Sequence, residues 1–326
     1  MDFAPFLIDP QRLWAGEEAW TGPLAIVDCE TAREWPAQPV LPPCPVIGLG
    51  DRAHPLAATL DTVIEAPVSL AGVVRQIVAR PRAAAVVTDL LRLLPSLPPR
   101  EGLVAESFAY AALQGSQEHL DWRAARAPQA PAIPGALRTA RAGELLTLTL
   151  DRAAAGNAID VPLRDALCEA LGAAVLDPTW ARIRLAARGR CFSLGAELAE
   201  FGATPDPATA HAIRRRTLPA RLLAELGPRL EALVQGACVG AGLEMAAFAS
   251  RVLATPDAWF QLPELAMGVL PGAGGCVSVS ARIGRQRAAL MILSGRRIDA
   301  RTARSWGLVD ALVDELPGDE AGPDIA

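Results

Sequence analysis

A strand–loop–helix order repeats along the second part of this 326-residue chain. The stretch "LLTLTLD" (145–151) alternates apolar and polar residues, as a half-buried strand does. The stretch "VPLRDALCEALGAAVL" (161–176) is helical in character, with Pro162 in the first turn, where proline is tolerated. Further strands are expected at 182–189 and 230–236, and further helices at 196–201 and 242–250. This order predicts an α/β fold whose β-rich core is wrapped by helices.

The chain before this region predicts a smaller α/β unit. Its apolar runs indicate buried strands at 23–29 and 45–50, and helices at 69–80, 82–94 and around 103–120. Residues 123–141 are rich in Pro, Ala and Arg without apolar periodicity, which predicts a linker. The expected organisation is an N-terminal α/β extension at 1–122, a linker at 123–141 and a larger core at 142–326.

Composition argues against several classes of function. A net charge of −5 provides no basic surface for nucleic acid. No signal peptide or membrane span is apparent, because the longest apolar run, near 232–249, is interrupted by Gln235 and Glu244. All 31 basic residues are arginine, which excludes a Schiff-base lysine. The six cysteines form no C-x-x-C pair and the three histidines are scattered, so we expect reduced thiols, no metal site and a cytoplasmic location.

The glycine-rich stretch "GACVGAGLEM" (236–245) leads into a helix, as phosphate-binding loops do. A dinucleotide fingerprint would need a third small residue where Met245 stands, and Glu244 would repel a phosphate. The stretch "CFSLGAEL" (191–198) has the same order of strand end, tight turn and helix start. The first N–H groups of a helix have no intrahelical partner, so two such turns brought together can bind one developing oxyanion.

Two carboxylates stand near these turns, Glu244 itself and Glu264 in "FQLPELAMGVLPGAGG" (260–275). In an apolar cleft such a pair can act as general acid and general base, because burial raises the pKa of both groups. From spacing alone the structural alternatives are favoured over catalysis. In those alternatives Glu244 is a first-turn helix residue favoured by the helix dipole, and Glu264 caps a loop.

Residues from about 140 to 314 resemble the enoyl-CoA hydratase/isomerase (crotonase) family. The resemblance rests on several stretches in the family's order. They are "CFSLGAELAEF", "GACVGAGLEMA", "QLPELAMGVLPGAGG", "GNAID" (156–160) and "GRQRAALMILSGRRIDARTARSWGLVDALV" (284–313). The resemblance implies a crotonase-like spiral of ββα turns, with the small N-terminal α/β unit as an addition. It also implies acyl-CoA thioesters as substrates, with coenzyme A present only as part of the substrate and no separate cofactor.

The resemblance assigns roles to individual residues. The thioester oxygen would be held by the backbone N–H groups of Ala196 and Ala241, the latter replacing the family's usual glycine. Glu244 and Glu264 fall on the positions of the two catalytic glutamates of hydratase members. Glu244 would take a proton from the attacking water, and Glu264 would supply the proton at Cα. The positions expected to line the substrate site are Ala158, Ser193, Leu194, Gly195, Gly240 and Gly272.

The chain also departs from the family. After "GLVDALVDEL" it ends within about ten residues, where family members continue with helices that close the acyl pocket. We expect the N-terminal helices to replace this cover, and we expect a homo-oligomer, a trimer or a hexamer by resemblance. The leading interpretation is hydration of a 2-enoyl-CoA to a 3-hydroxyacyl-CoA. The alternatives are an enoyl-CoA isomerase or related enolate chemistry, and a non-catalytic acyl-CoA-binding subunit.

Overall fold

The structure is a computed structural model that describes residues 2–11, 21–32, 40–127 and 133–317. Its largest element is a six-stranded sheet with the order β12-β9-β7-β6-β5-β4. Only the β4–β5 pair is antiparallel, and the other neighbours are parallel. The strands are β4 (Ala136–Ala142), β5 (Leu145–Asp151), β6 (Arg182–Ala187), β7 (Leu230–Val234), β9 (Arg251–Ala254) and β12 (Ala311–Leu312).

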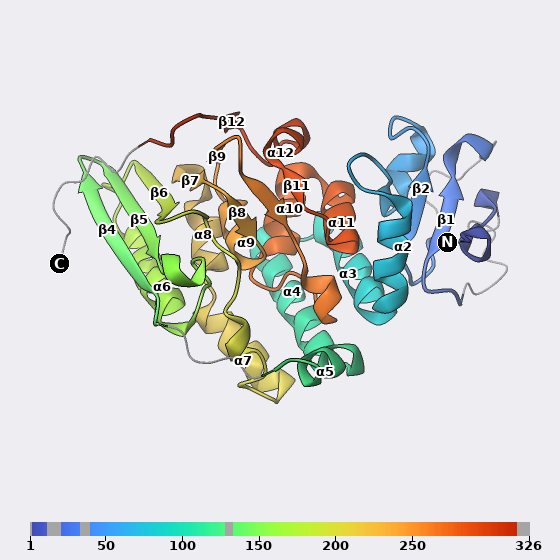
Figure 1. The fold of residues 1–326 in the computed structure, drawn as a ribbon, viewed down its shortest axis with the longest axis horizontal. Helices are drawn as coiled ribbons and strands as arrows, with labels where there is room; N and C mark the ends of the chain where they lie inside the picture. Colours follow the sequence, from blue (N-terminus) through green and yellow to red (C-terminus); the bar gives the residue numbers. More distant parts are fainter. Residues whose placement is uncertain (1, 12–20, 33–39, 128–132, 318–326) are drawn as a thin grey trace.

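A second sheet has three short strands in the order β11-β10-β8. Its strands are β8 (Ala237–Val239), β10 (Trp259–Gln261) and β11 (Ile298–Asp299). The helices of this part are α6 (Val161–Leu176), α7 (Pro207–Thr217), α8 (Ala220–Leu226), α9 (Ala241–Ala246), α10 (Gly275–Ile283), α11 (Arg285–Ser294) and α12 (Ala300–Trp306). Strand β8 directly follows β7 and β10 directly follows β9, whereas α9 leads from β8 to β9 and α12 leads from β11 to β12 (Figure 1).

The N-terminal part contains a third sheet, of three parallel strands in the order β1-β2-β3. Four helices then lead toward the six-stranded sheet, and Figure 1 shows them in the middle of the molecule. The strands are β1 (Ala25–Asp28), β2 (Val46–Leu49) and β3 (Thr62–Val63), and the helices are α2 (Leu70–Ala79), α3 (Pro81–Leu93), α4 (Pro99–Gln114) and α5 (Gln117–Ala124). The predicted α/β character of both parts is confirmed.

The N-terminal helices share one hydrophobic core with the second part of the chain. Helix α3 buries Ala83, Val87 and Leu91, which recur at helical spacing and therefore lie on one face. That face belongs to the same cluster as Leu290 of α11, and α11 contacts both α2 and α3. A smaller separate cluster lies at the β1-β2-β3 sheet. The N-terminal helices are therefore packed against the larger part of the chain.

Two local predictions were wrong. The stretch 123–141 is not a linker throughout, because α5 extends to Ala124 and β4 pairs with β5 from Ala136 onward. The burial pattern of β4 is hidden in the sequence because three of its four half-buried positions are Thr or Ala, and only Leu137 is strongly apolar. The single helix expected around 103–120 is two helices, because the Ser116 side chain accepts a hydrogen bond from the His119 N–H and starts α5.

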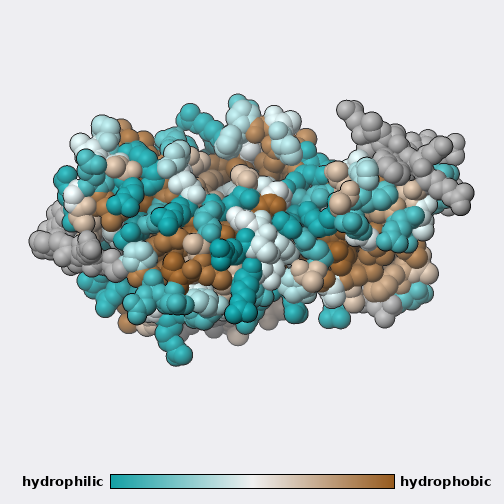
Figure 2. Space-filling model, turned by 90° about the horizontal axis from the view of Figure 1, so that it is seen from above, coloured by the Kyte–Doolittle hydropathy of each residue, from teal (hydrophilic) through white to brown (hydrophobic). Residues whose placement is uncertain are grey.

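The surface seen from above carries hydrophilic residues over much of its area, with apolar residues in separate patches between them (Figure 2). In the described ranges, none of the helices has both the length and the apolar character that a bilayer crossing needs.

Candidate active site

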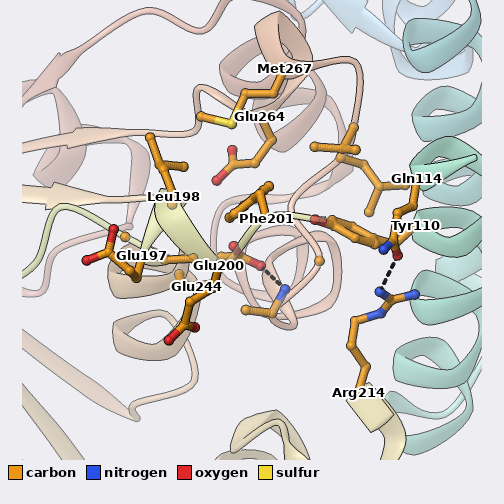
Figure 3. A pocket seen from close by; sticks show the side chains of 18 of the residues that line it. Tyr110, Gln114, Glu197, Leu198, Glu200, Phe201, Arg214, Glu244, Glu264 and Met267 are labelled. Carbon is orange, nitrogen blue, oxygen red and sulfur yellow. Dashed lines mark hydrogen bonds between the residues drawn. The ribbon is translucent and has the colours of Figure 1, made fainter. Parts of the chain in front are cut away.

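A cavity of about 280 Å³ lies between the loop after β6, the start of α9, the segment after β10 and helix α4. Figure 3 shows it from close by. Both predicted carboxylates, Glu244 and Glu264, line this cavity, as do Ala196 and Ala241. Tyr110 and Gln114 of α4 and His119 of α5 also line it. Side chains of the N-terminal helices therefore form part of the cavity wall.

The backbone N–H groups of Ala196 and Ala241 lie in two loops that touch. A Cβ atom added to Gly195 would lie 3.6 Å from the Ala241 nitrogen and 3.0 Å from the Val239 oxygen. Neither N–H has an acceptor among the residues that the structure describes. Two free donors on adjacent loops at a cavity wall are what a developing oxyanion requires.

The two loops do not share one design, and the helix expected at 196–201 was wrong. Only a short 3-10 turn at Leu198–Glu200 follows Ala196, which itself forms a strand-like bridge with Ile159. The Ile159 N–H donates to the Gly195 oxygen at 2.8 Å, and the Glu197 N–H donates to the Ile159 oxygen at 2.9 Å. Successive groups of an extended chain point to opposite sides, which leaves the Ala196 N–H free. Only Ala241, at the first position of α9, stands at a helix start.

Ser193 and Asn157 hold the first loop in shape. The Ser193 hydroxyl donates to the Asn157 oxygen at 2.8 Å and accepts from the Gly195 N–H at 3.1 Å. The Asn157 side-chain amide donates to the backbone oxygens of Arg188 and Cys191 at 2.8 and 2.9 Å. Both side chains are fully buried. Ser193 thus builds the loop behind the cavity wall, and the sequence did not reveal the role of Asn157.

The other predicted substrate-site residues divide into two groups. Leu194, Gly195, Gly240 and Gly272 line the cavity. Ala158 lies outside the lining, beside the loop, where its oxygen accepts from Arg152 at 3.0 Å. A direct substrate contact by Ala158 stays a prediction.

Glu244 projects from α9 and is only 2% exposed. Its Oε2 accepts hydrogen bonds from the N–H groups of Ala273 and Gly275 at 2.6 and 2.8 Å. Burial raises the pKa of Glu244 to about 7, and the two N–H donors work against this rise. The group is therefore close to half ionised near neutral pH, as suits a general base.

Glu264 lacks such donors. Its Oε2 is buried and has no hydrogen-bond partner in the described part of the chain. Its Oε1 points toward the oxyanion loop, since a Cβ atom added to Gly240 would lie 2.6 Å from it. Burial, and then the charge of Glu244, raise the pKa of Glu264 well above its ordinary value. Of the two cavity carboxyl groups, Glu264 is therefore the one whose protonated form its surroundings favour.

A third buried carboxylate, Glu106, comes from α4 and was missed in the sequence. It is 2% exposed, its Oε1 accepts from the Gly274 N–H at 2.7 Å, and its Oε2 accepts from the Cys276 N–H at 2.9 Å. Burial, and then the charge of Glu244, raise the pKa of Glu106 well above its ordinary value. Nothing in the sequence separates Glu106 from the exposed acids of an amphipathic helix.

The backbone before α10 is thus held from two sides. Four consecutive N–H groups, those of residues 273 to 276, donate alternately to Glu244 and Glu106. Tyr110 adds a steric contact, because a Cβ atom added to Gly272 would lie 2.2 Å from its Cδ2. The N-terminal helices therefore fix the backbone that orients Glu244.

In the described ranges, no group of three or more His, Cys, Asp or Glu side chains could hold a metal ion. The carboxyl groups of the cavity, beside two oxyanion donors, can carry out proton transfer.

The comparisons with known proteins agree with this geometry. The sequence model described as "Enoyl-CoA hydratase/isomerase" matches residues 140–317, which is more than half of the chain. The chain belongs to this family. The family match leaves out the N-terminal helices that contribute Glu106 and Tyr110.

Two curated members of the enoyl-CoA hydratase/isomerase family illustrate the similarity. A 2,3-dehydroadipyl-CoA hydratase of Escherichia coli (strain K12) is 38% identical over 183 residues, 56% of this chain and 70% of the relative. A cyclohexa-1,5-dienecarbonyl-CoA hydratase of Thauera aromatica is 35% identical over 175 residues, 54% of this chain and 66% of the relative. The chain thus matches about two thirds of the length of these relatives.

A solved structure of the same family extends the similarity to the fold. The putative enoyl-CoA hydratase/isomerase from Mycobacterium abscessus shares 34% identity and a TM-score of 0.51, over 55% of this chain and 71% of that chain. The crotonase-like α/β fold expected from the sequence is confirmed.

Proposed function

We propose that this protein adds water to a 2-enoyl-CoA thioester and forms a 3-hydroxyacyl-CoA. The observation that carries the proposal is a pair of carboxyl groups on one cavity, Glu244 bound by two N–H groups and Glu264 with a buried oxygen that lacks a donor in the described ranges, beside two free N–H donors. The named hydratases among the relatives support the same reaction class.

The proposed reaction uses one carboxyl group for each proton. The thioester oxygen accepts hydrogen bonds from the N–H groups of Ala196 and Ala241. Glu244 removes a proton from water as the water oxygen bonds to Cβ, and the electrons of the double bond move onto the thioester as an enolate. Glu264 then donates its proton to Cα. Exchange of one proton between the carboxyl groups and solvent restores the starting state.

The assignment of these two roles follows from their hydrogen bonds. Two N–H donors stabilise the charged form of Glu244, so this group is the one that can be ionised and act as a base. Glu264 has a buried oxygen without a donor, so its neutral form is favoured and it can act as an acid. Each free N–H that holds the enolate contributes about 2.7–4 kcal/mol in comparable sites.

A second cavity, of about 400 Å³, offers a place for the nucleotide of coenzyme A. It shares Leu198 and Phe201 with the first cavity and is otherwise lined largely by α5 and the residues that follow it. The Arg126 guanidinium lies 4.9 Å from the centre of the Trp122 ring. We propose that an adenine ring stacks on these aromatic side chains while Arg123 and Arg126 bind phosphates.

Substitution of each acid tests the mechanism. Conversion of crotonyl-CoA and longer enoyl-CoAs is followed for the wild type, Glu244→Gln and Glu264→Gln. The exposed Glu169→Gln on α6 serves as the matched control. We expect each active-site variant to lose about 10²–10⁴-fold in kcat, and the control to keep its rate. Turnover that survives both substitutions refutes the mechanism, and binding of enoyl-CoA without any turnover favours the non-catalytic alternative.

The isomerase alternative requires movement of a proton between Cα and Cγ without addition of water. The presence of both acids beside the cavity favours hydration, because a hydratase needs a base for water and an acid for Cα. Product analysis in ¹⁸O-labelled water separates the two reactions. A hydratase incorporates the label into the product, whereas an isomerase does not.

We also propose that the protein needs no cofactor beyond the coenzyme A of its substrate, forms a homo-oligomer and acts in the cytoplasm. All six cysteines are free thiols, which supports a reducing compartment. Activity after chelation and desalting tests the cofactor expectation. Sedimentation equilibrium tests the assembly, and a monomer at working concentration refutes it.

A further inference from the structure

Arg214 of α7 lies on the wall of the cavity beside Tyr110 and Gln114 of α4 (Figure 3). Its Nη1 donates to Gln114 Oε1 at 2.9 Å. Its Nε and Nη2 lie 3.4 Å from the Ser107 Oγ and the Ser107 backbone oxygen. Its Cζ lies 4.4 Å from the centre of the Tyr110 ring. All of these contacts are with neutral groups.

No ion pair joins Arg214 to a carboxylate in the part of the chain that the structure describes. Burial lowers the pKa of Arg214, and the negative charge of Glu106 works against this lowering without forming a direct ion pair. A partly buried charge that lacks a direct ion pair costs free energy. The guanidinium has five N–H donors, and two of its three described contacts are at the long limit of a hydrogen bond. Arg214 therefore retains donors in a planar array, which is the geometry that binds a carboxylate through two oxygens.

The surroundings of Arg214 extend this positive charge. A smaller cavity of about 70 Å³ shares Arg214, Leu218 and Gly272 with the first one. Three further arginines line it, namely Arg100, Arg215 and Arg221, of which Arg221 is paired with Glu225 at 2.9 Å. The lining also contains one carboxylate, Glu106, which already accepts hydrogen bonds from the backbone N–H groups of Gly274 and Cys276.

Apolar side chains also line the cavity to which Arg214 belongs. Ala210, Ile213, Leu218, Val269 and Leu270 line it. An acyl chain whose thioester oxygen is held at Ala196 and Ala241 would thus pass apolar side chains and end at a guanidinium. An alkyl terminus would leave that guanidinium without a partner, whereas an anionic terminus would neutralise it.

We propose that Arg214 binds a carboxylate at the far end of the acyl chain, so that the preferred substrate is the monothioester of coenzyme A with an unsaturated dicarboxylic acid. This inference rests on the proposed function, because the thioester end is located by the oxyanion donors. Arg214 is then a specificity-determining residue. The structural alternative is that Arg214 only holds α7 against α4, in which case its loss would affect all substrates alike.

A matched pair of substrates tests the inference. The pair is hex-2-enoyl-CoA, which ends in a methyl group, and the six-carbon 2-enoyl-CoA with a terminal carboxylate. We expect wild-type kcat/KM to favour the carboxylate by about tenfold or more, and Arg214→Gln to lose about 10–100-fold on that substrate alone. Arg214→Lys keeps the charge without the planar array and should retain part of the preference. Arg216→Gln, at an exposed position of the same helix, is the control and should match the wild type.

The inference is overturned if the wild type shows no preference for the carboxylate, or if Arg214→Gln lowers kcat/KM equally for both substrates. The wild-type comparison decides the matter even if Arg214→Gln does not fold. If neither thioester is converted, the proposed hydration fails on its own. Calorimetric binding of the saturated analogues, adipyl-CoA and hexanoyl-CoA, to the wild type then tests Arg214 separately. Tighter binding of adipyl-CoA supports the inference, and equal binding overturns it.

Discussion

Glu106 connects helix α4 to the backbone that orients Glu244, the proposed base, so its removal is expected to harm both stability and catalysis. In Glu106→Ala, the N–H groups of Gly274 and Cys276 lose their acceptor inside the protein. A buried N–H without a partner costs about 1–3 kcal/mol, so the free energy of unfolding should fall by about 2–6 kcal/mol.

The Glu106→Gln variant sharpens this test. The side-chain amide of glutamine can still accept one of the two N–H groups, but its NH₂ faces the other. We therefore expect a smaller loss, about 1–3 kcal/mol. Since Glu106 also adds to the negative charge that raises the pKa of Glu264, the neutral amide should lower the pH at which Glu264 loses its proton.

The assays are urea unfolding of the wild type and the two variants, and kcat/KM for an enoyl-CoA across pH. Exposed Glu101→Ala, near the start of the same helix, is the matched control and should unfold like the wild type. Surface substitutions usually change the free energy of unfolding by no more than about 0.5 kcal/mol. If the free energy of unfolding of Glu106→Ala differs from that of the wild type by no more than this, and its pH profile is unchanged, the backbone before α10 does not depend on Glu106.

The remaining predictions concern pH and packing. The plot of kcat/KM against pH should rise through about pH 7, where Glu244 loses its proton, and fall where Glu264 loses its own, because its pKa is raised further; a flat profile contradicts the assigned roles. Since the raised pKa of Glu244 makes the folded state bind more protons than the unfolded one from about pH 4.5 to 7, its contribution should lower the free energy of unfolding as pH rises across this window. Urea titrations of the wild type and Glu244→Gln measure this difference. Gly272→Ala should lose activity because its methyl group would meet the Tyr110 ring at 2.2 Å, and Tyr110→Ala should restore activity to it; an active Gly272→Ala single variant contradicts the contact.

Local patterns in the sequence were enough for much of the fold and for the two loops of the site. Strands and helices with clear periodicity, such as 145–151 and 161–176, have the expected type within a residue of the expected ends. Glu244 and Glu264 stand in short motifs whose meaning depends on neighbouring residues. Together with the family resemblance, those motifs predict that the two glutamates line the same cavity, as they do in the structure.

The parts that could not be predicted depend on residues far apart in the chain. Glu106 accepts a hydrogen bond from Gly274, which lies 168 residues further along the chain, and no local sequence pattern predicts such a contact. The free N–H of Ala196 arises from a bridge to Ile159 and not from a helix start, so the local reason given for this free N–H was wrong. Strand β4 was missed because pairing with β5, rather than its own composition, makes it a strand.

The shared core of the N-terminal helices and α11 has a consequence for synthesis of the chain. Helices α2 to α5 leave the ribosome before α10 and α11 exist, so their apolar faces have no native partner during most of translation. A truncated chain therefore exposes those faces and lacks Gly274 and Cys276, whose N–H groups donate hydrogen bonds to Glu106. Chaperone binding and aggregation should thus affect incomplete chains most. Once α11 is complete, the chain would be released from the chaperone at the stage when the cavity residues come together.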